Sequence, residues 1–239
     1  FPPSIPMVIY AMLSGASIGK LFMGGMVPGV LLAILLMIYV AFISHKRNYP
    51  AGVVMSKREF LKATLQALPA LFTVVILLGG IYSGICTPTE AGAVASAYAL
   101  IISALIYKTL GWKKLWGIIK KSAANTATLA LLCGTSMLFS YIISLEQVPR
   151  VVASLVMGIT DNKYIFLFIV NIVFLLLGCV LDVSTIQLVF VPMVLPLVQA
   201  MGIDLVHFGV VICLNMMIGL STPPFGMLLF IVSGLGKTK

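Results

Sequence analysis

The sequence predicts an all-α, multi-pass membrane protein, and its composition and apolar runs carry that prediction. Of the 239 residues, 61% are hydrophobic and only 9% are charged, with a mean hydropathy of +1.18. A soluble domain has about 25% charged residues, so this chain lacks the polar surface that water requires. Membrane barrels give short alternating segments, whereas the apolar runs here are long and continuous. Membrane-spanning helices are the remaining fold class.

Uncharged apolar runs define the expected membrane segments in chain order. About 20 helical residues cross the roughly 30 Å hydrocarbon layer. Runs near this length occupy residues 21–44, 63–89, 91–107, 122–145, 164–181, 183–203 and 205–236. The last run is interrupted by Pro223-Pro224.

The basic residues predict the orientation of these segments. Twelve of the 15 Lys and Arg residues lie in 45–62, in 108–121 and in the C-terminal tail. Cytoplasmic loops carry an excess of Lys and Arg, so these three stretches are expected inside. The turn at 87–90 and the stretches 146–163 and 202–204 are then expected outside. The net charge of +9 is therefore explained by the orientation of the loops and by contact with anionic lipid. Nucleic acid is not an expected partner, because short loops make no basic stripe.

Three amphipathic stretches are expected to lie along the membrane surface. Residues 148–159 place their apolar side chains on one helical face, and 108–121 do the same with Trp112 and Trp116. A third such helix opens at the capping box Ser56–Glu59. The four cysteines, in contrast, are scattered through apolar segments and are expected to be small buried hydrophobic residues.

The turn Thr87-Pro88-Thr89-Glu90 supports two interpretations. Thr87 suits an N-cap, Pro88 the first helical position, and Glu90 the position that reaches back to the cap. This structural interpretation is preferred. The alternative makes Glu90 a carboxylate that binds a coupling ion.

Asp182 is an acid between two apolar runs, and an ionisable group at membrane depth is a functional candidate. Either the two runs cross fully and Asp182 caps a cytoplasmic turn, or they form a re-entrant hairpin with its tip in mid-membrane. Pro192 and Pro196 would bend the second run, which favours the hairpin.

The motif Gly219–Gly226 predicts a broken helix. Pro223 and Pro224 remove two N–H donors and clash with the preceding turn. Exposed backbone at this depth persists only beside a cavity or inside protein. Freed carbonyls with the hydroxyls of Ser221 and Thr222 suit a small cation, and the alternative is a plain proline kink. The first residues repeat the pattern, because Pro2-Pro3 also precedes a short apolar run. Two broken helices of opposite direction are typical of inverted-repeat secondary transporters.

Three strings make the chain resemble a known family: residues 1–6 (FPPSIP), 84–91 (GICTPTEA) and 221–226 (STPPFG). They resemble the large membrane (M) subunit of the tripartite ATP-independent periplasmic (TRAP) transporters, along essentially the whole chain. The resemblance implies a fragment that lacks the N-terminal part and the last helix of that subunit. Val183 is a departure, since the family usually has proline there.

The resemblance also implies a function. Such a permease imports an organic acid, such as a C4-dicarboxylate or a sialic acid, through the bacterial inner membrane with Na⁺ as the coupling ion. A periplasmic binding protein delivers the substrate, a small membrane subunit supports the large one, and a transport domain moves against a scaffold as an elevator. Residues 1–13 would then be the second half of the first broken helix, 14–145 the scaffold and arm helices, 146–163 an outer interfacial segment, and 164–235 the re-entrant hairpin with the second broken helix.

Candidate site residues follow from the resemblance and from their chemistry. Hydroxyl and carbonyl oxygens suit sodium, and the positive ends of half-helices suit a substrate carboxylate. The sodium candidates are Asp182, Ser184, Thr185, Gly219, Ser221, Thr222 and Pro223, and the substrate-facing candidates are Pro3, Ser4, Pro224 and Gly226.

Other function classes have less support. The sequence contains no ATP-binding motif and no catalytic cluster, and His207 stands alone, so neither an enzyme nor a cofactor is expected. No metal is expected beyond transported Na⁺. A sodium/dicarboxylate symporter that needs no binding protein is the closest alternative, followed by a membrane subunit that does not transport.

Overall fold

All the elements in the described part of the chain are helices. The computed structural model describes residues 2–49, 56–158, 160, 162–224 and 226–236, and these hold ten helices, α1 to α10, and no strand. Five of these helices are long and apolar enough to cross a membrane. The prediction of an all-α, multi-pass membrane protein is confirmed.

The chain divides into two compact units, which are described separately. One consists of Phe1–Pro3 and Met26–Ala124, and the other of Ser4–Gly25 and Asn125–Lys239. Helices α2 (Ile18–Lys46) and α5 (Trp112–Leu145) each contribute residues to both units.

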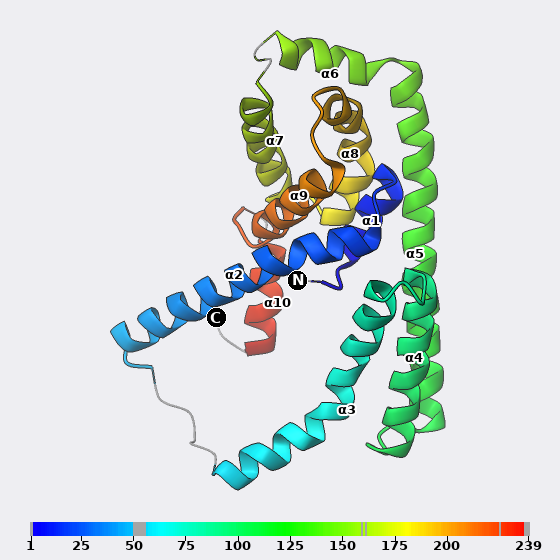
Figure 1. Cartoon of the computed structure of the whole chain (residues 1–239), viewed down its shortest axis with the longest axis vertical. Coiled ribbons are helices and arrows are strands. Elements are labelled where there is room, and N and C mark those ends of the chain that lie inside the picture. The colour runs from blue at the N-terminus through cyan, green and yellow to red at the C-terminus, as the bar shows by residue number, and fades with distance from the viewer. Residues whose placement is uncertain (1, 50–55, 159, 161, 225, 237–239) are drawn as a thin grey trace. The chain divides into compact units, whose positions relative to one another are not determined.

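The first unit contains a helix pair, α3 (Lys57–Tyr82) and α4 (Pro88–Leu105), joined by a short turn. The two helices pack against each other, and Figure 1 shows them side by side. Two tyrosine hydroxyls join them: Tyr98 donates to the Pro69 carbonyl at 3.2 Å and Tyr107 to the Gln66 carbonyl at 2.6 Å. Pro69 lies inside α3, and because a proline has no N–H group, the Leu65 carbonyl one turn earlier loses its helical donor.

Two of the three amphipathic stretches continue directly into membrane segments. Residues 57–66 belong to α3, and residues 112–121 belong to the 34-residue α5. Neither forms a separate arm, because no residue between the amphipathic part and the apolar part ends the helix. The third stretch is a separate helix, α6 (Val148–Met157), and its expected last apolar position, Ile159, lies outside the described residues.

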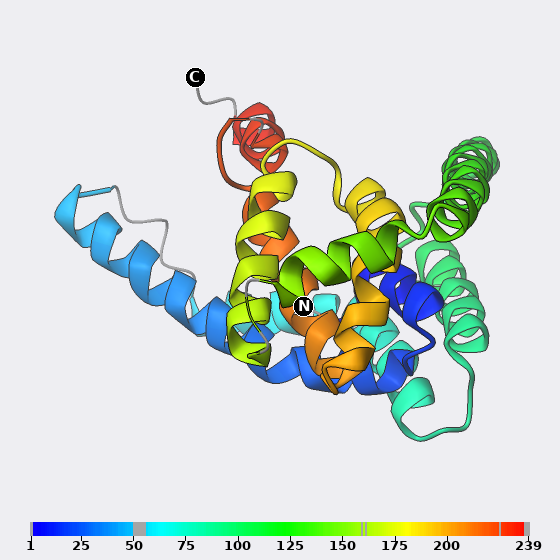
Figure 2. The same ribbon diagram turned by 90° about the horizontal axis from the view of Figure 1, so that it is seen from above.

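The second unit packs short helices around a buried core. It contains α1 (Ile5–Ser14), α6, α7 (Lys163–Gly178), α8 (Val183–Ala200), α9 (Leu205–Leu220) and α10 (Met227–Gly236). Figure 2 shows α7, α8 and α9 side by side, and α6 runs crosswise to α7 and α8 in both views. Helix α8 continues through Pro192 and Pro196. The largest fully buried side chains of this unit include Tyr10, Phe166, Phe174 and Phe208.

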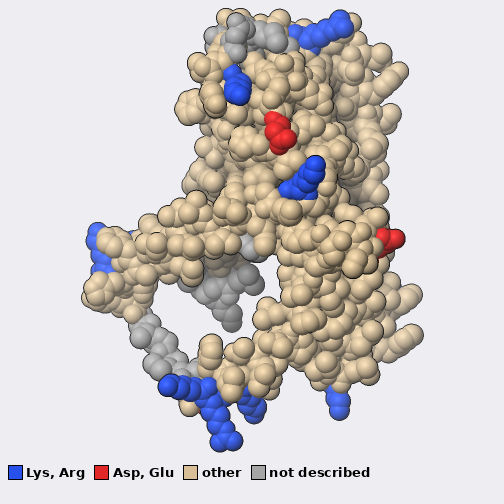
Figure 3. All heavy atoms as spheres, viewed as in Figure 1, with Lys and Arg blue, Asp and Glu red and all other residues tan. Residues whose placement is uncertain are grey.

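Apolar side chains cover most of the surface outside this core. Phe42 is 66% exposed and Leu131 is 71% exposed, and many other large apolar residues are exposed as well. Figure 3 shows an almost uniformly uncharged surface, with basic side chains gathered where α3 begins. Such a surface is stable in lipid and unstable in water.

Candidate functional site

The break between α9 and α10 leaves backbone oxygens without their helical partners. In a continuous helix the carbonyls of Gly219 and Leu220 would accept from the N–H groups of residues 223 and 224. Both of those residues are prolines, so both donors are missing. The Gly219 carbonyl instead accepts from the Thr222 N–H at 2.8 Å. The Leu220 carbonyl cannot accept from either proline, so the break removes its helical donor.

Two hydroxyls lie at this break. Ser221 Oγ and Thr222 Oγ1 both donate to the Ile218 carbonyl, at 2.7 and 2.8 Å. A hydroxyl oxygen that donates its proton keeps its acceptor lone pairs. Ser221 is exposed and Thr222 is half-buried. The end of α9 therefore presents hard oxygen atoms, which are the ligands that alkali cations prefer.

The turn between α7 and α8 is organised by Asp182. Its carboxylate accepts from the Ser184 N–H at 2.9 Å and so caps the start of α8. The side chain of Asp182 is exposed, while Ser184 and Thr185 are half-buried in the first turn of α8. This cap is compatible with either interpretation of the turn, a full crossing or a re-entrant tip.

A close backbone contact joins the C-terminal ends of α7 and α9, just before the turn and the break. A Cβ atom on Gly219 would lie 2.9 Å from the Cα of Gly178 and 2.9 Å from the carbonyl oxygen of Leu175. Only glycines permit helices α7 and α9 to approach this closely. In Figure 2 the turn between α7 and α8 and the break between α9 and α10 lie on the same side of this unit.

The first proline motif leads into α1, which packs on α8 and α9. The Tyr10 hydroxyl donates to the Leu205 carbonyl at 2.7 Å, and a Cβ on Gly209 would overlap the Tyr10 ring. Ser4 precedes α1 with an extended backbone and makes no side-chain cap.

The remaining substrate-facing candidates lie near the two Pro-Pro bonds, both of which are cis. Pro3 and Pro224 are exposed, and Gly226 has a φ of +47° that favours glycine. Among the described residues, no hydrogen bond joins Ser4 to Pro224 or Gly226.

The sequence interpretation missed three amide side chains of this unit, of which Asn171 and Asn215 are half-buried and Gln187 is fully buried. The Asn215 amide donates to the Asn171 Oδ1 at 2.6 Å and to the Asn171 carbonyl at 2.8 Å, which joins α9 to α7. The amide of the fully buried Gln187 donates to the sulfur of Cys213 at 3.3 Å. Within the described part of the chain, Gln187 Oε1 and Asn215 Oδ1 have no hydrogen-bond partner. The signal was present in the sequence, because an amide inside an apolar run marks a face that packs on protein.

Thr87 and Glu90 lie in the first unit. Thr87 Oγ1 accepts from the Glu90 N–H at 3.3 Å, and the Glu90 carboxylate accepts from the Thr87 N–H at 2.8 Å. The Thr87 hydroxyl also donates to that carboxylate at 2.8 Å. These contacts form a reciprocal cap at the start of α4.

Because this cap needs a side-chain oxygen and no negative charge, Glu90→Gln should leave the fold nearly intact. Glutamine completes a capping box as glutamate does, so we expect a loss of stability of under about 1 kcal/mol. Thermal unfolding of the purified variant tests this expectation. Sodium binding that the wild type shows and the variant loses would assign the carboxylate to an ion site instead.

Comparison with known proteins gives the family of the chain. The family model for the tripartite ATP-independent periplasmic transporter, DctM component, matches residues 1–239. The sialic acid TRAP transporter large permease protein SiaM of Vibrio cholerae is 43% identical over 98% of this chain and 55% of its own length. The C4-dicarboxylate large permease protein DctM of Pseudomonas aeruginosa is 39% identical over 98% and 55%. The 2,3-diketo-L-gulonate large permease protein YiaN of Escherichia coli is 35% identical over 100% and 56%.

The chain thus spans about half the length of the curated relatives it matches. The match nevertheless covers every segment described above, including both proline motifs and the turn at Asp182. The family is the permease component of a transporter and not an enzyme. The chain belongs to the DctM family, the large permease component of the tripartite ATP-independent periplasmic transporters.

Proposed function

We propose that the chain is part of the large permease of an importer in the bacterial inner membrane. We infer that this importer is coupled to sodium and transports an organic acid. The single observation that best supports this function is the contact of Gly178 with Gly219. Gly178 precedes Asp182 by four residues and Gly219 precedes Ser221 by two, so this contact supports a site between the turn and the break. Sodium would be held between them by oxygens from Asp182, Ser184, Thr185, Gly219, Ser221, Thr222 and Pro223.

The length of α7 favours the re-entrant interpretation of the hairpin, while the 18 residues of α8 would also allow a full crossing. Helix α7 has 16 residues, which span about 24 Å at 1.5 Å per residue. This length is less than the roughly 30 Å of the hydrocarbon layer. A tip that ends inside the membrane therefore fits α7 better than a full crossing does, and it would place Asp182 within the membrane, as is proposed for the break between α9 and α10.

The substrate would lie where helix ends point into the site. Helix α1 begins at Ile5, two residues after Pro3, and α10 begins at Met227, three residues after Pro224. The N-terminal end of a helix carries a partial positive charge, so the two ends suit a carboxylate near Ser4, Pro224 and Gly226. The curated relatives are named for sialic acid, C4-dicarboxylates and 2,3-diketo-L-gulonate, and all three are acids.

The partners follow from the family. We infer a periplasmic binding protein that delivers the substrate and a small membrane subunit that supports the permease. A related protein of Oleidesulfovibrio alaskensis is named an isethionate TRAP transporter permease protein DctMQ.

Uptake by the complete transporter in proteoliposomes tests this function. We expect labelled C4-dicarboxylates or sialic acid to accumulate only with an inward sodium gradient and only with the cognate binding protein outside. Uptake without the binding protein would favour the alternative, a sodium/dicarboxylate symporter. Equal uptake with and without the sodium gradient would exclude the proposed coupling.

The orientation has its own test. Single cysteines introduced at Asn48 and Thr109 should react with an impermeant thiol reagent only from the cytoplasm, because the flanking stretches carry most of the basic residues. A cysteine at Asp161, which lies outside the described residues, should react only from the periplasm. Periplasmic labelling at Asn48 would reverse the whole topology.

A further inference from the structure

A groove of about 800 Å³ lies on the first compact unit, between the first half of α3 and the end of α4. The oxygen-rich turn and the break described above belong to the second unit. Its lining comes from one face of α3 and from the two residues that follow α4, namely Arg58, Leu61, Lys62, Leu65, Gln66, Pro69, Ile106 and Tyr107.

Local backbone chemistry builds this groove. Pro69 has no N–H group and its ring pushes against the preceding turn, so α3 cannot pack evenly along its length. The Tyr107 hydroxyl bonds the Gln66 carbonyl at 2.6 Å and fixes the chain after α4 against α3. The groove is therefore a formed feature of the helix pair.

Within the part of the chain that the structure describes, the two cations of the groove have no acidic partner. Arg58 and Lys62 are four residues apart on α3, where like charges repel. Among the described residues neither forms an ion pair, and the neighbouring carboxylate of Glu59 accepts from the Ser56 N–H at 2.9 Å. A guanidinium and an ammonium side by side suit a phosphate group.

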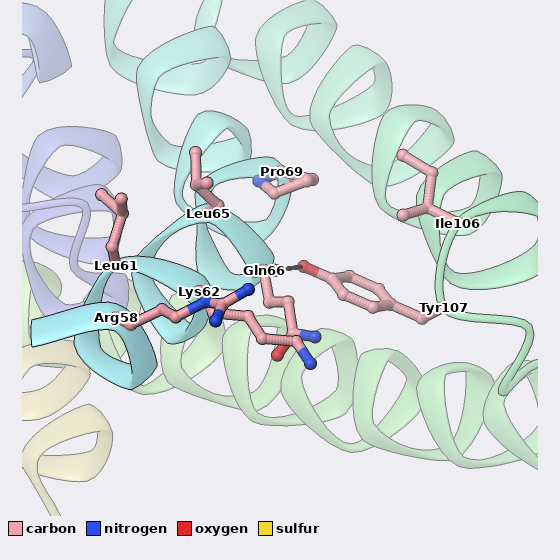
Figure 4. A pocket seen from close by; sticks show the side chains of 8 residues that line it. All are labelled: Arg58, Leu61, Lys62, Leu65, Gln66, Pro69, Ile106 and Tyr107. Carbon is pink, nitrogen blue, oxygen red and sulfur yellow. Dashed lines mark hydrogen bonds between the residues drawn. The ribbon is translucent and has the colours of Figure 1, made fainter. Parts of the chain in front are cut away.

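The opposite side of the groove is apolar. Figure 4 shows Leu65, Pro69 and Ile106 along one side, while Arg58 and Lys62 extend toward the hydrogen bond between Gln66 and Tyr107. Leu61 is 60% and Leu65 is 61% exposed, so both are available to a ligand. From Arg58 to Pro69 the helix rises about 16 Å, which is roughly half the hydrocarbon thickness. The groove thus has a basic end at Arg58 and Lys62 and an apolar part that is long enough for an acyl chain.

We propose that this groove binds an anionic phospholipid of the membrane. Its phosphate lies between Arg58 and Lys62, and one acyl chain lies against Leu61, Leu65, Pro69 and Ile106. The two positive charges require more negative charge than a zwitterionic headgroup offers, so phosphatidylglycerol is selected over phosphatidylcholine.

Quenching by brominated lipids tests the site in the complete permease. Leu65→Trp places a reporter in the groove, in a background where all other tryptophans are phenylalanine. We expect brominated phosphatidylglycerol to bind there more tightly than phosphatidylcholine with the same brominated chains. A basic residue near the surface contributes roughly fivefold in affinity for anionic lipid. Arg58→Gln with Lys62→Gln should therefore reduce the preference by up to about 25-fold.

The matched control removes two lysines expected on the same side of the membrane but outside the groove, Lys113→Gln with Lys121→Gln, and should keep the preference. Native mass spectrometry of the permease with its own tryptophans gives a second measurement of the same ratio. Equal quenching by both lipids, or an equal loss in both double variants, would overturn the proposal. Absence of quenching by either lipid would also overturn it, because the groove would then be covered by protein.

Discussion

Gly219→Ala should abolish most transport by the complete permease and lower its thermal stability. The added methyl group would lie 2.9 Å from the Gly178 Cα and from the Leu175 carbonyl oxygen. Both are backbone atoms and cannot rotate away, so α7 and α9 must separate. Overpacking of this kind costs about 1–3 kcal/mol. Sodium-driven uptake and the unfolding temperature of the purified variant measure the two effects.

Gly134→Ala is the control for this variant. A Cβ at Gly134, within α5, meets nothing within 4 Å. Alanine is favoured over glycine in a helix interior by about 0.5–1 kcal/mol, so stability should be equal or slightly higher and uptake unchanged. If Gly219→Ala behaves like Gly134→Ala, the backbones of α7 and α9 do not touch in the working protein, and the candidate sodium site loses its geometric support.

Loss of a single hydroxyl should weaken sodium binding. Thr222→Val and Ser184→Ala each remove one candidate ligand while keeping the local volume close to that of the original residue. A hydrogen bond to a charged group contributes roughly 1–3 kcal/mol, so the sodium concentration for half-maximal uptake should rise about fivefold to a hundredfold. Measuring uptake against sodium concentration in proteoliposomes gives this value directly.

Two controls separate an ion ligand from a helix cap. Thr222→Ser keeps the hydroxyl and should restore the sodium dependence, whereas Leu229→Ala in α10 should leave it unchanged. A purely structural role for the Thr222 hydroxyl, through its bond to the Ile218 carbonyl at 2.8 Å, would lower stability without shifting the sodium dependence. Wild-type sodium dependence in both Thr222→Val and Ser184→Ala would exclude these side chains as ligands.

The local features of the fold could be predicted from the sequence. Helix α9 ends at Leu220 because Pro223 and Pro224 follow it. Helix α4 begins after Thr87 because Thr87 and Glu90 cap it. Each of these outcomes depends on residues within one or two helical turns. The lengths of α3 and α5 could not be predicted in this way. An amphipathic pattern indicates the surroundings of a segment and does not indicate where its helix ends.

The fold class, the helix breaks and the helix caps were therefore determined by the sequence alone. Only the tertiary structure decided which faces meet: Gly178 with Gly219, Asn171 with Asn215, and Tyr10 with Gly209. The physical reason is the solvent. In water a helix shows an apolar face to the core and a polar face outward, but lipid is as apolar as a leucine side chain. Both faces of a membrane helix are then apolar, and long-range partners are chosen by close packing and by a few buried amides.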